Sequence, residues 1–492
     1  MSKKVLIVGT GLGGLATGLR LASRGYDITY VEKYKQPGGR LNQIKKDGFT
    51  FDTGPSFFSM TYEFEELVED TGIKMPFEFV ELDPLYTVHF SGSPRKFFLY
   101  KDIEKLEAQF ADIEPNFKNI FTNYLKKCEQ LYNDTIDVVI KRNFNSISDY
   151  IKALMEVNPR HLPVLFKNFW SQTGNYFTSR VVRSIVSLIA FFLGRTPFDT
   201  NAVYTLLSHI EFKYNGYYNV RGGMYRIVEG IVNELKKFNV KFHYNTEIVD
   251  FEEDGGKLEL LVDQNGKKWQ ADIFVINSDA AYFRGKVFRR PAFSEKRLST
   301  MSWTMGYLTF YLGINKKLPD VEHHNYFLGS NYEEYAKDVM RNPGTIEKPY
   351  YYVNIISKYN EECAPQGHEA LFFVCPVPNL MYKNDWTDRD VIIDSIIDDF
   401  SKRIGQDIRD NIVCRMAYTP EDWQNQFNLY KGGGLGLSHT MKQIGAFRPR
   451  NYDEKFKNTF YVGASTVPGA GLPMAIISSK LVTERIMRLS VE

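Results

Sequence analysis

The hydrophobic pattern of the first 33 residues predicts a strand, a helix and a second strand in close succession. Val5–Val8 is a continuous apolar run, which is typical of a buried strand in a parallel sheet. Apolar residues then recur at helical spacing from Leu15 to Ala22, and Gly25 follows as a residue type that ends helices. Ile28–Val31 predicts the second strand. This order indicates an α/β fold that starts with a parallel pair of strands.

Helical periods dominate the chain from about residue 63 to residue 207. Ile103–Phe110 and Phe117–Leu131 interleave apolar residues with Lys, Glu and Asp, as amphipathic helices do. Two further stretches, Leu162–Trp170 and Ser184–Leu193, are unusually apolar and have basic edges. Each fits either a helix buried in the core or a helix that dips into a membrane surface. Both are far shorter than the roughly 20 apolar residues that a membrane span needs.

The pattern returns to strands near residue 210. The predicted elements are a strand at Val240–Ile248, a β-hairpin at Lys257–Val262 and Trp269–Ile276, a strand at Met305–Leu312, and a last strand at Thr459–Val462 followed by a helix from about Met474 to Leu489. We therefore expect a discontinuous α/β domain made of residues 1–62, 210–283 and 425–492. Residues 63–209 and 284–424 form the second domain, a mixed α+β substrate domain with a helical membrane-associated region.

Composition narrows the class of protein. The 492 residues exceed what one hydrophobic core usually spans, so two domains are expected. A net charge of +2 gives no support for a nucleic-acid partner. The four cysteines include no C-x-x-C pair and the eight histidines form no ligand pattern, so we expect reduced thiols and no metal. The apolar run after the basic residues 1–4 is too short for a signal peptide, which predicts a cytoplasmic protein.

Glycines follow the first predicted strand at the spacing of a dinucleotide site. Gly9 and Gly11 permit a tight turn and close approach of the backbone to a pyrophosphate, and Gly14 lets the helix pack on the sheet. Glu32 closes the second strand, where an acid holds the ribose hydroxyls. The predicted cofactor contacts in this segment are Gly9, Gly11, Leu12, Gly13, Gly14, Glu32 and Lys33.

A second phosphate contact favours FAD over NAD. A Pro-Gly-Gly-Arg turn follows the acidic strand end, and glycine lets the backbone bend towards a ligand while arginine clamps phosphate. Another strand then ends near Asp52 and turns tightly beneath the expected flavin ring, with a plain turn as the alternative. The predicted contacts in these two segments are Gly39, Arg40, Gly54, Pro55 and Ser56.

The C-terminal motif completes the predicted cofactor site. Residues 463–473 form a loop of small residues, which lets a flat ring lie against the backbone. The helix that follows presents its N-terminus where negative charge develops on a reduced flavin. The strand near residue 248 and the end of the hairpin supply further contacts. The predicted set is Glu247, Ile248, Asn277, Gly463, Ala464, Pro473, Met474 and Ala475.

Through these motifs the chain resembles the carotenoid desaturases of the bacterial phytoene desaturase family, within the flavin amine oxidase superfamily. The resemblance spans nearly the whole chain and is strongest to hydroxycarotenoid 3,4-desaturases. It implies a Rossmann-like FAD-binding domain, FAD, and an acyclic, 1-hydroxylated C40 carotenoid that loses a hydride and a proton to gain a conjugated C=C bond. It also implies peripheral attachment to a membrane surface, with oxygen or a quinone as the electron acceptor.

The aromatic stretch Tyr204–Tyr218 holds the candidates for acid–base chemistry. His209, Glu211 and Lys213 stand at alternate positions, so on a strand they face one side, towards the flavin. A structural role is the alternative for each. Because a cation on a polyene is delocalised, no strong base is required, and we expect cofactor and orientation to dominate catalysis.

Other readings stay open. On the same fold they are a phytoene-type desaturase, a carotenoid isomerase, an amine oxidase, and a non-catalytic prenyl-binding protein resembling GDP-dissociation inhibitors. The C-terminal loop has no cysteine to tether a flavin, and the flavin motifs are intact, which argues against the last two. The basic segment Arg284–Arg297 is either a solvated face or a contact with anionic lipid.

Overall fold

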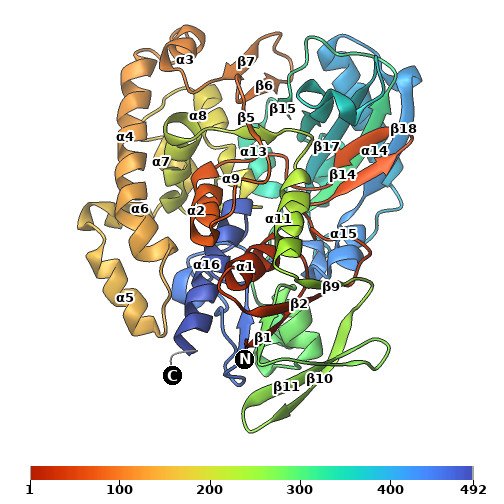
Figure 1. The fold of residues 1–492 in the computed structure, drawn as a ribbon. Coiled ribbons are helices and arrows are strands. Elements are labelled where there is room, and N and C mark those ends of the chain that lie inside the picture. Colours follow the sequence, from red (N-terminus) through yellow and green to blue (C-terminus); the bar gives the residue numbers. More distant parts are fainter. Residues whose placement is uncertain (1, 490–492) are drawn as a thin grey trace.

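A five-stranded parallel sheet with β1 at its centre forms the lower part of the molecule in Figure 1. The computed structural model describes residues 2–489, so residues 1 and 490–492 of the predicted domains lie outside the described residues. The strands in spatial order are β19 (Thr459–Tyr461), β13 (Ile273–Ile276), β1 (Lys4–Val8), β2 (Asp27–Val31) and β9 (Lys241–His243). The sheet therefore joins distant segments of the chain, while the domain boundaries stay a prediction.

Helices α1 (Leu12–Ala22), α11 (Arg226–Lys237) and α16 (Leu472–Leu489) share one hydrophobic core with this sheet. Leu15 and Leu19 of α1 are fully buried, as their helical spacing predicts. The Tyr30 hydroxyl of β2 donates a hydrogen bond to the Gly14 carbonyl at 2.9 Å. The first helix is thus held directly against the second strand.

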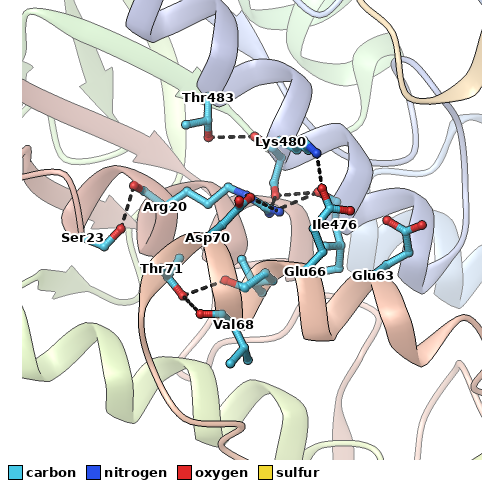
Figure 2. A network of polar contacts seen from close by, with 12 residues as sticks. Arg20, Ser23, Glu63, Glu66, Val68, Asp70, Thr71, Ile476, Lys480 and Thr483 are labelled. Atoms are coloured by element: carbon cyan, nitrogen blue, oxygen red, sulfur yellow. Dashed lines mark hydrogen bonds and ion pairs between the residues drawn. The ribbon is translucent and has the colours of Figure 1, made fainter. Parts of the chain in front are cut away.

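A buried charge network joins α1, α2 (Thr61–Thr71) and α16 (Figure 2). The Arg20 side chain is only 1% exposed and forms an ion pair with Asp70 at 3.0 Å. Arg20 Nη1 also donates to the Ser479 hydroxyl at 2.6 Å and to the Ile476 carbonyl at 3.3 Å. Burial of a guanidinium is costly unless its donors are paired, and these contacts pair them. The network fixes the helices that carry the first and last sequence motifs.

A three-stranded antiparallel sheet and a seven-stranded mixed sheet complete the main β-structure. The three-stranded sheet contains β10 (Ile248–Asp254), β11 (Lys257–Asp263) and β12 (Lys268–Gln270). The predicted hairpin is right for β11 and β12, but its second strand, Trp269–Ile276, is divided, because Ile273–Ile276 forms β13 of the parallel sheet. The seven-stranded sheet has the order β18 (Ile412–Tyr418), β14 (Gly306–Ile314), β17 (Glu369–Val377), β16 (Tyr351–Ile355), β15 (His324–Leu328), β6 (Tyr86–Phe90) and β7 (Lys96–Leu99). In this sheet β6 and β15 pair in parallel. Smaller pairs are β3 (Gln43–Lys46) with β4 (Phe49–Asp52), and β5 (Phe79–Glu81) with β8 (Tyr218–Val220).

Helices cover the left side of the molecule in Figure 1. They include α3 (Ile103–Phe110), α4 (Phe117–Thr135), α5 (Ile147–Glu156), α6 (Leu162–Leu165), α7 (Phe169–Thr173), α8 (Arg180–Val186), α9 (Ile189–Phe192) and α10 (Leu206–His209). The remaining α-helices are α12 (Glu295–Leu298), α13 (Tyr332–Asp338), α14 (Arg389–Ile404) and α15 (Pro420–Phe427). Within residues 2–489, no helix combines the length and apolar character required to cross a bilayer.

Several sequence predictions need correction. The region from residue 63 to residue 207 is not only helical, because β5, β6 and β7 lie within it. The predicted strand at Val240–Ile248 is limited to β9. Ser184–Leu193 is not a membrane-dipping helix: α8 and α9 bury most of it in the core, so the buried alternative is right.

The basic segment Arg284–Arg297 is not simply a solvated face. Arg284 is fully buried, lies 3.6 Å from the Tyr461 ring centroid, and pairs with Glu454 at 3.2 Å. Arg290 forms an ion pair with Asp453 at 2.6 Å. These two arginines turn inward because aromatic and acidic partners from the C-terminal part of the chain meet them. They are therefore unavailable to lipid headgroups.

Candidate active site

A cavity of about 1170 Å³ lies at the carboxyl ends of β1, β2 and β13. In the sheet, β2 lies on one side of β1 and β13 lies on the other, so the strand order reverses direction at β1. Open α/β sheets bind their ligands at such a reversal, outside the carboxyl ends of the strands. All predicted cofactor contacts except Gly14 line this cavity. They are Gly9, Gly11, Leu12, Gly13, Glu32, Lys33, Gly39, Arg40, Gly54, Pro55, Ser56, Glu247, Ile248, Asn277, Gly463, Ala464, Pro473, Met474 and Ala475.

The glycine loop is shaped by Asn277, the residue that follows β13. A Cβ atom on Gly9 would lie 2.7 Å from the Asn277 carbonyl oxygen, and one on Gly11 would lie 2.8 Å from Asn277 Oδ1. Gly9 also has a φ of +94°, which side chains disfavour. Only glycine fits at these two positions, so the backbone lies open to the cavity.

Gly14 has a packing role instead of a cavity-lining one. A Cβ atom there would lie 2.6 Å from the Gly9 carbonyl oxygen. Its backbone amide donates to Asn277 Oδ1 at 3.0 Å, and Asn277 Nδ2 donates to the Val462 carbonyl at 3.0 Å. The Asn277 amide therefore ties the start of α1 to the segment that follows β19.

The Glu32 carboxylate is held in place by three donors. Its Oε2 accepts hydrogen bonds from the Thr10 amide at 2.8 Å and the Thr10 hydroxyl at 2.6 Å, and its Oε1 accepts one from the Tyr34 amide at 3.0 Å. A fixed carboxylate that lines the cavity suits ribose hydroxyls, which donate hydrogen bonds. Thr10 escaped sequence reasoning, although it lies inside the glycine motif.

Lys33 and Glu247 occupy the same end of the cavity and pair with each other. Lys33 Nζ lies 3.3 Å from Glu247 Oε1, and the Tyr282 hydroxyl donates to that oxygen at 2.8 Å. Glu247 and Ile248 precede and begin β10, so they do not extend the strand β9 as the sequence predicts. Both residues nevertheless line the cavity.

Arg40 is a cation with unused donors at the cavity wall. Among the described residues, its hydrogen bond goes from Nη1 to the Gly434 carbonyl at 2.9 Å. Burial lowers the pKa of Arg40, and the neighbouring Asp279 opposes that change. A guanidinium has five N–H groups, so several remain for an anionic group such as a pyrophosphate. Asp279, which sequence reasoning missed, accepts a hydrogen bond from the Ser465 hydroxyl at 3.0 Å.

The C-terminal loop brings the second chain segment to the cavity. Gly463, Gly469 and Gly471 have φ angles of +101°, +145° and +131°, so the backbone follows a path open only to glycine. The Ala470 amide donates to His439 Nε2 at 3.2 Å. Helix α16 then begins at Leu472, and its first residues line the cavity. Its N-terminus faces the ligand space with the positive end of the helix dipole.

A polar chain that sequence reasoning missed borders Ser56. The Tyr352 hydroxyl donates to Ser56 Oγ at 2.9 Å and lies 2.6 Å from His324 Nδ1. Burial lowers the pKa of His324 well below its ordinary value, so this imidazole is neutral. These residues come from β15 and β16, whose histidine- and tyrosine-rich sequences were the available signal.

The three acid–base candidates do not lie on a strand. His209 ends α10, and Glu211 and Lys213 belong to a π-helical turn at Ile210–Tyr214. Lys213 is an exposed partner of Glu129, and His209 stacks on Tyr214, so neither lines the cavity. Glu211 is 2% exposed and does line it. One candidate of the three therefore remains at the site.

The rest of the cavity is apolar. It extends from the glycine loop past α9, α10 and the seven-stranded sheet, and also reaches α5 and α6. Representative wall residues are Ile151, Leu162, Phe192, Leu206, Tyr307 and Val374. The site thus combines a polar end suited to a dinucleotide with a long apolar space.

Comparison with known proteins supports this geometry. The family model described as flavin containing amine oxidoreductase matches residues 12–487. A zeta-carotene-forming phytoene desaturase of Myxococcus xanthus is 32% identical, with 99% of this chain and 94% of the relative covered. A phytoene desaturase of Fusarium fujikuroi is 30% identical over 99% and 90% of the two chains. A carotenoid 3,4-desaturase of Haloarcula japonica is 27% identical over 98% of each.

Solved structures share the fold at lower identity. An oxidoreductase from Methanosarcina mazei superposes with a TM-score of 0.65 at 14% identity, with 98% of this chain and 100% of that chain covered. A putrescine oxidase variant gives 0.65 at 12% identity over 99% of each chain. A Rab GDI from Plasmodium falciparum gives 0.56 at 11% over 99% and 98%. Because oxidases and a GDI superpose alike, the fold does not decide between their functions.

The residues present fit FAD, which supplies a hydride acceptor when it is bound. The glycine cradle, the fixed Glu32 carboxylate and the Arg40 guanidinium match a dinucleotide, and the loop before α16 leaves room for a flat ring. FAD is therefore the cofactor and the protein is an oxidoreductase. The chain belongs to the flavin containing amine oxidoreductase family.

Proposed function

We propose that the protein is a carotenoid desaturase that acts on an acyclic C40 carotenoid with a hydroxyl group near the reacting end. The observation that carries the proposal is the continuity of one cavity from the glycine loop into a long apolar space. A polyene is rigid and apolar, so it needs such a space and few polar anchors. The full-length similarity to carotenoid desaturases supports the same substrate class.

The chain's own residues then bind and orient the substrate. The apolar walls exclude water and hold the polyene against the cofactor. Because the positive charge that develops on the polyene is delocalised, this orientation contributes far more to the rate than a strong base would. The cofactor-binding part of the proposal comprises the nineteen lining residues named above together with Gly14, which packs the loop. We also propose that residues 1–62, 210–283 and 425–492 form the FAD-binding domain. Residues 63–209 and 284–424 then form the substrate domain.

Substrate comparison tests the function. The holoenzyme is incubated in liposomes with a 1-hydroxylated acyclic carotene and, separately, with its unhydroxylated parent. We expect a product of longer absorption wavelength from the hydroxylated compound and slower conversion of the parent. Faster conversion of the parent favours a phytoene-type desaturase. Isomerisation without gain of a double bond favours a carotenoid isomerase, and no conversion of either compound refutes the proposal.

Peripheral membrane attachment is part of the proposal, at the first of the two stretches that the sequence suggested, Leu162–Trp170, together with α5, and not at Ser184–Leu193. The α5–α6 apolar patch consists of Ile147, Ile151, Leu154, Met155, Leu162 and Phe166, which are 48%, 49%, 39%, 71%, 55% and 87% exposed. Four of these residues also line the cavity. Exposed apolar side chains at a cavity mouth allow a carotenoid to pass from lipid to the site without crossing water.

Liposome flotation tests the attachment. Met155→Asp/Phe166→Asp should reduce the bound fraction while the flavin spectrum stays native, because both side chains are exposed and neither is a predicted cofactor contact. Val391→Asp is a matched control, since Val391 is 73% exposed on α14, away from the patch. Equal flotation of the double variant and the parent protein contradicts the assignment.

A further inference from the structure

A buried polar cluster interrupts the apolar wall of the cavity. Its members are Glu211, Tyr217 and Tyr326, each of which lines the cavity and is no more than 6% exposed. They come from the π-helical turn after α10, from the residue before β8, and from β15. Tyr86 of β6 supports the cluster from behind, because its hydroxyl donates to Glu211 Oε1 at 2.7 Å.

Two hydroxyls of the cluster are unsatisfied. Among the described residues, the Tyr326 hydroxyl has no hydrogen-bond partner although it is buried. The Tyr217 hydroxyl lies near enough to the Glu211 carboxyl to oppose the pKa rise that burial of this carboxyl causes, but among those residues it makes no hydrogen bond of good geometry. An unpaired buried hydroxyl destabilises the folded state, so native structures rarely leave one without reason. Both residues border the same ligand space, and this suggests that a ligand supplies the missing partner.

The surroundings of the cluster are otherwise apolar and aromatic. The Phe57 ring centroid lies 4.9 Å from that of Tyr217, and the Phe192 centroid lies 6.1 Å from it. Tyr86 and Tyr326 rings meet edge to face at 5.4 Å. Tyr352 also lines the cavity and its ring centroid lies 5.3 Å from that of Tyr326, but its hydroxyl already donates to Ser56 Oγ. A ligand with one oxygen atom at the cluster and hydrocarbon against the neighbouring aromatic rings would fit these side chains.

We propose that Glu211, Tyr217 and Tyr326 form a subsite that binds the hydroxyl oxygen of the carotenoid and sets how far the polyene enters the cavity. This inference rests on the proposed function and names the residues that give its hydroxyl preference. An alcohol donates one hydrogen bond and accepts others, and the cluster offers both kinds of group. Desolvation raises the pKa of Glu211 to about 8, so at neutral pH the carboxylic acid also donates.

Substrate-dependent kinetics of the holoenzyme test the subsite. The variants are Glu211→Leu, Tyr217→Phe and Tyr326→Phe, with Glu211→Gln as the conservative change that keeps hydrogen bonding. For the hydroxylated carotene we expect Glu211→Leu to lower kcat/KM on the order of 10-fold or more, mainly through KM. For the unhydroxylated parent the value should stay within about threefold of the unmutated enzyme. Glu211→Gln should recover most of the lost discrimination.

Other outcomes separate the alternatives. Equal losses of kcat for both carotenes, with KM unchanged, overturn the subsite and indicate a role in proton transfer. Unchanged discrimination in Glu211→Leu and in a Tyr217→Phe/Tyr326→Phe double variant also overturns it. Lys213→Ala is the matched control, because Lys213 lies on the same helical turn but outside the cavity.

If the unmutated enzyme converts neither carotene, the proposed function has failed instead. In that case, quenching of protein fluorescence by the hydroxylated carotene still tests binding, and equal affinity in all variants refutes the subsite.

Discussion

The side-chain oxygen of Asn277 accepts a hydrogen bond from the Gly14 backbone amide at 3.0 Å. This contact joins the residue after β13 to the start of α1 and leaves no space for side chains on the glycine loop. A site that is often described as a flexible glycine-rich turn is therefore rigid in this protein. The rigidity comes from a residue more than half the chain away in sequence.

Gly11→Ala should abolish FAD retention. Its new Cβ would lie 2.8 Å from Asn277 Oδ1, which forces the loop or the amide to move. We expect purified protein with little flavin absorbance and a lower melting temperature after incubation with FAD. Gly344→Ala is a control, because its Cβ meets only the Asn342 side chain at 3.2 Å. Full flavin occupancy in Gly11→Ala contradicts the role of the loop.

Arg40→Ala should weaken FAD binding without unfolding the protein. It removes a charge-assisted contact worth roughly 1.5–3 kcal/mol, which corresponds to about 10- to 100-fold in Kd. Titration of apoprotein with FAD, followed by flavin fluorescence, measures the change. Arg409→Ala removes an exposed ion pair with Asp398 and should leave Kd unchanged.

FAD should also be bound without a covalent link. None of the described cysteines, Cys128, Cys363, Cys375 and Cys414, lines the cavity. Acid precipitation of the holoprotein should therefore release the yellow colour into the supernatant. Colour that stays in the protein pellet would show that another side chain forms a tether.

Arg20→Ala should destabilise the folded state by about 1–3 kcal/mol, because it removes a buried guanidinium whose Asp70 partner stays 30% exposed to water. It also leaves the Ser479 hydroxyl without its donor (Figure 2). Urea unfolding measures the loss. Arg24→Ala is the control, since Arg24 contributes one hydrogen bond, to the Arg20 carbonyl. If both variants unfold at the same urea concentration as the parent, the network contributes little to stability.

Stability should fall as pH rises from about 6.5 to about 8. Below this window, histidines whose pKa values are lowered by burial contribute the opposite dependence. They include His89, His323, His324 and His439. Burial raises the pKa of Glu211 from 4.5 to about 8 and that of Asp52 from 3.8 to about 7. The folded state therefore holds more protons than the unfolded chain in this window, so deprotonation favours unfolding. Urea unfolding of the parent and of Glu211→Gln at several pH values measures the slope. The variant should show a shallower decline, and equal slopes contradict the shifted pKa of Glu211.

Local signals made the cofactor end predictable. Val5–Val8 forms a strand because its residues are apolar on both faces, and the glycines after it are demanded by backbone geometry that only glycine meets. Glu32 follows its strand directly, so its position needs no knowledge of distant contacts. Such features depend on residues that are close together in the sequence, so they can be recognised without the structure.

Long-range contacts explain what the sequence could not predict. His209, Glu211 and Lys213 show an alternation typical of strands, yet they form helical turns because α4 packs beside α10. Arg284 lies in a basic run, but it is buried because its guanidinium packs on the Tyr461 ring and pairs with Glu454. The unsatisfied hydroxyls near Glu211 come from separate elements, and no local pattern brings Tyr217 and Tyr326 together.

The order of strands in the parallel sheet also constrains synthesis on the ribosome. β1 emerges early, but its neighbour β13 and the outer strand β19 are translated only after residues 273 and 459 have been reached. At synthesis rates of about 5–20 residues per second, the edge of β1 that pairs with β13 stays unpaired on the order of tens of seconds. The residues of the last loop and helix complete the wall around the flavin. We therefore expect FAD to bind only after residues 463–475 have been made, and we expect soluble yield to depend on how well the edge of β1 is shielded until then.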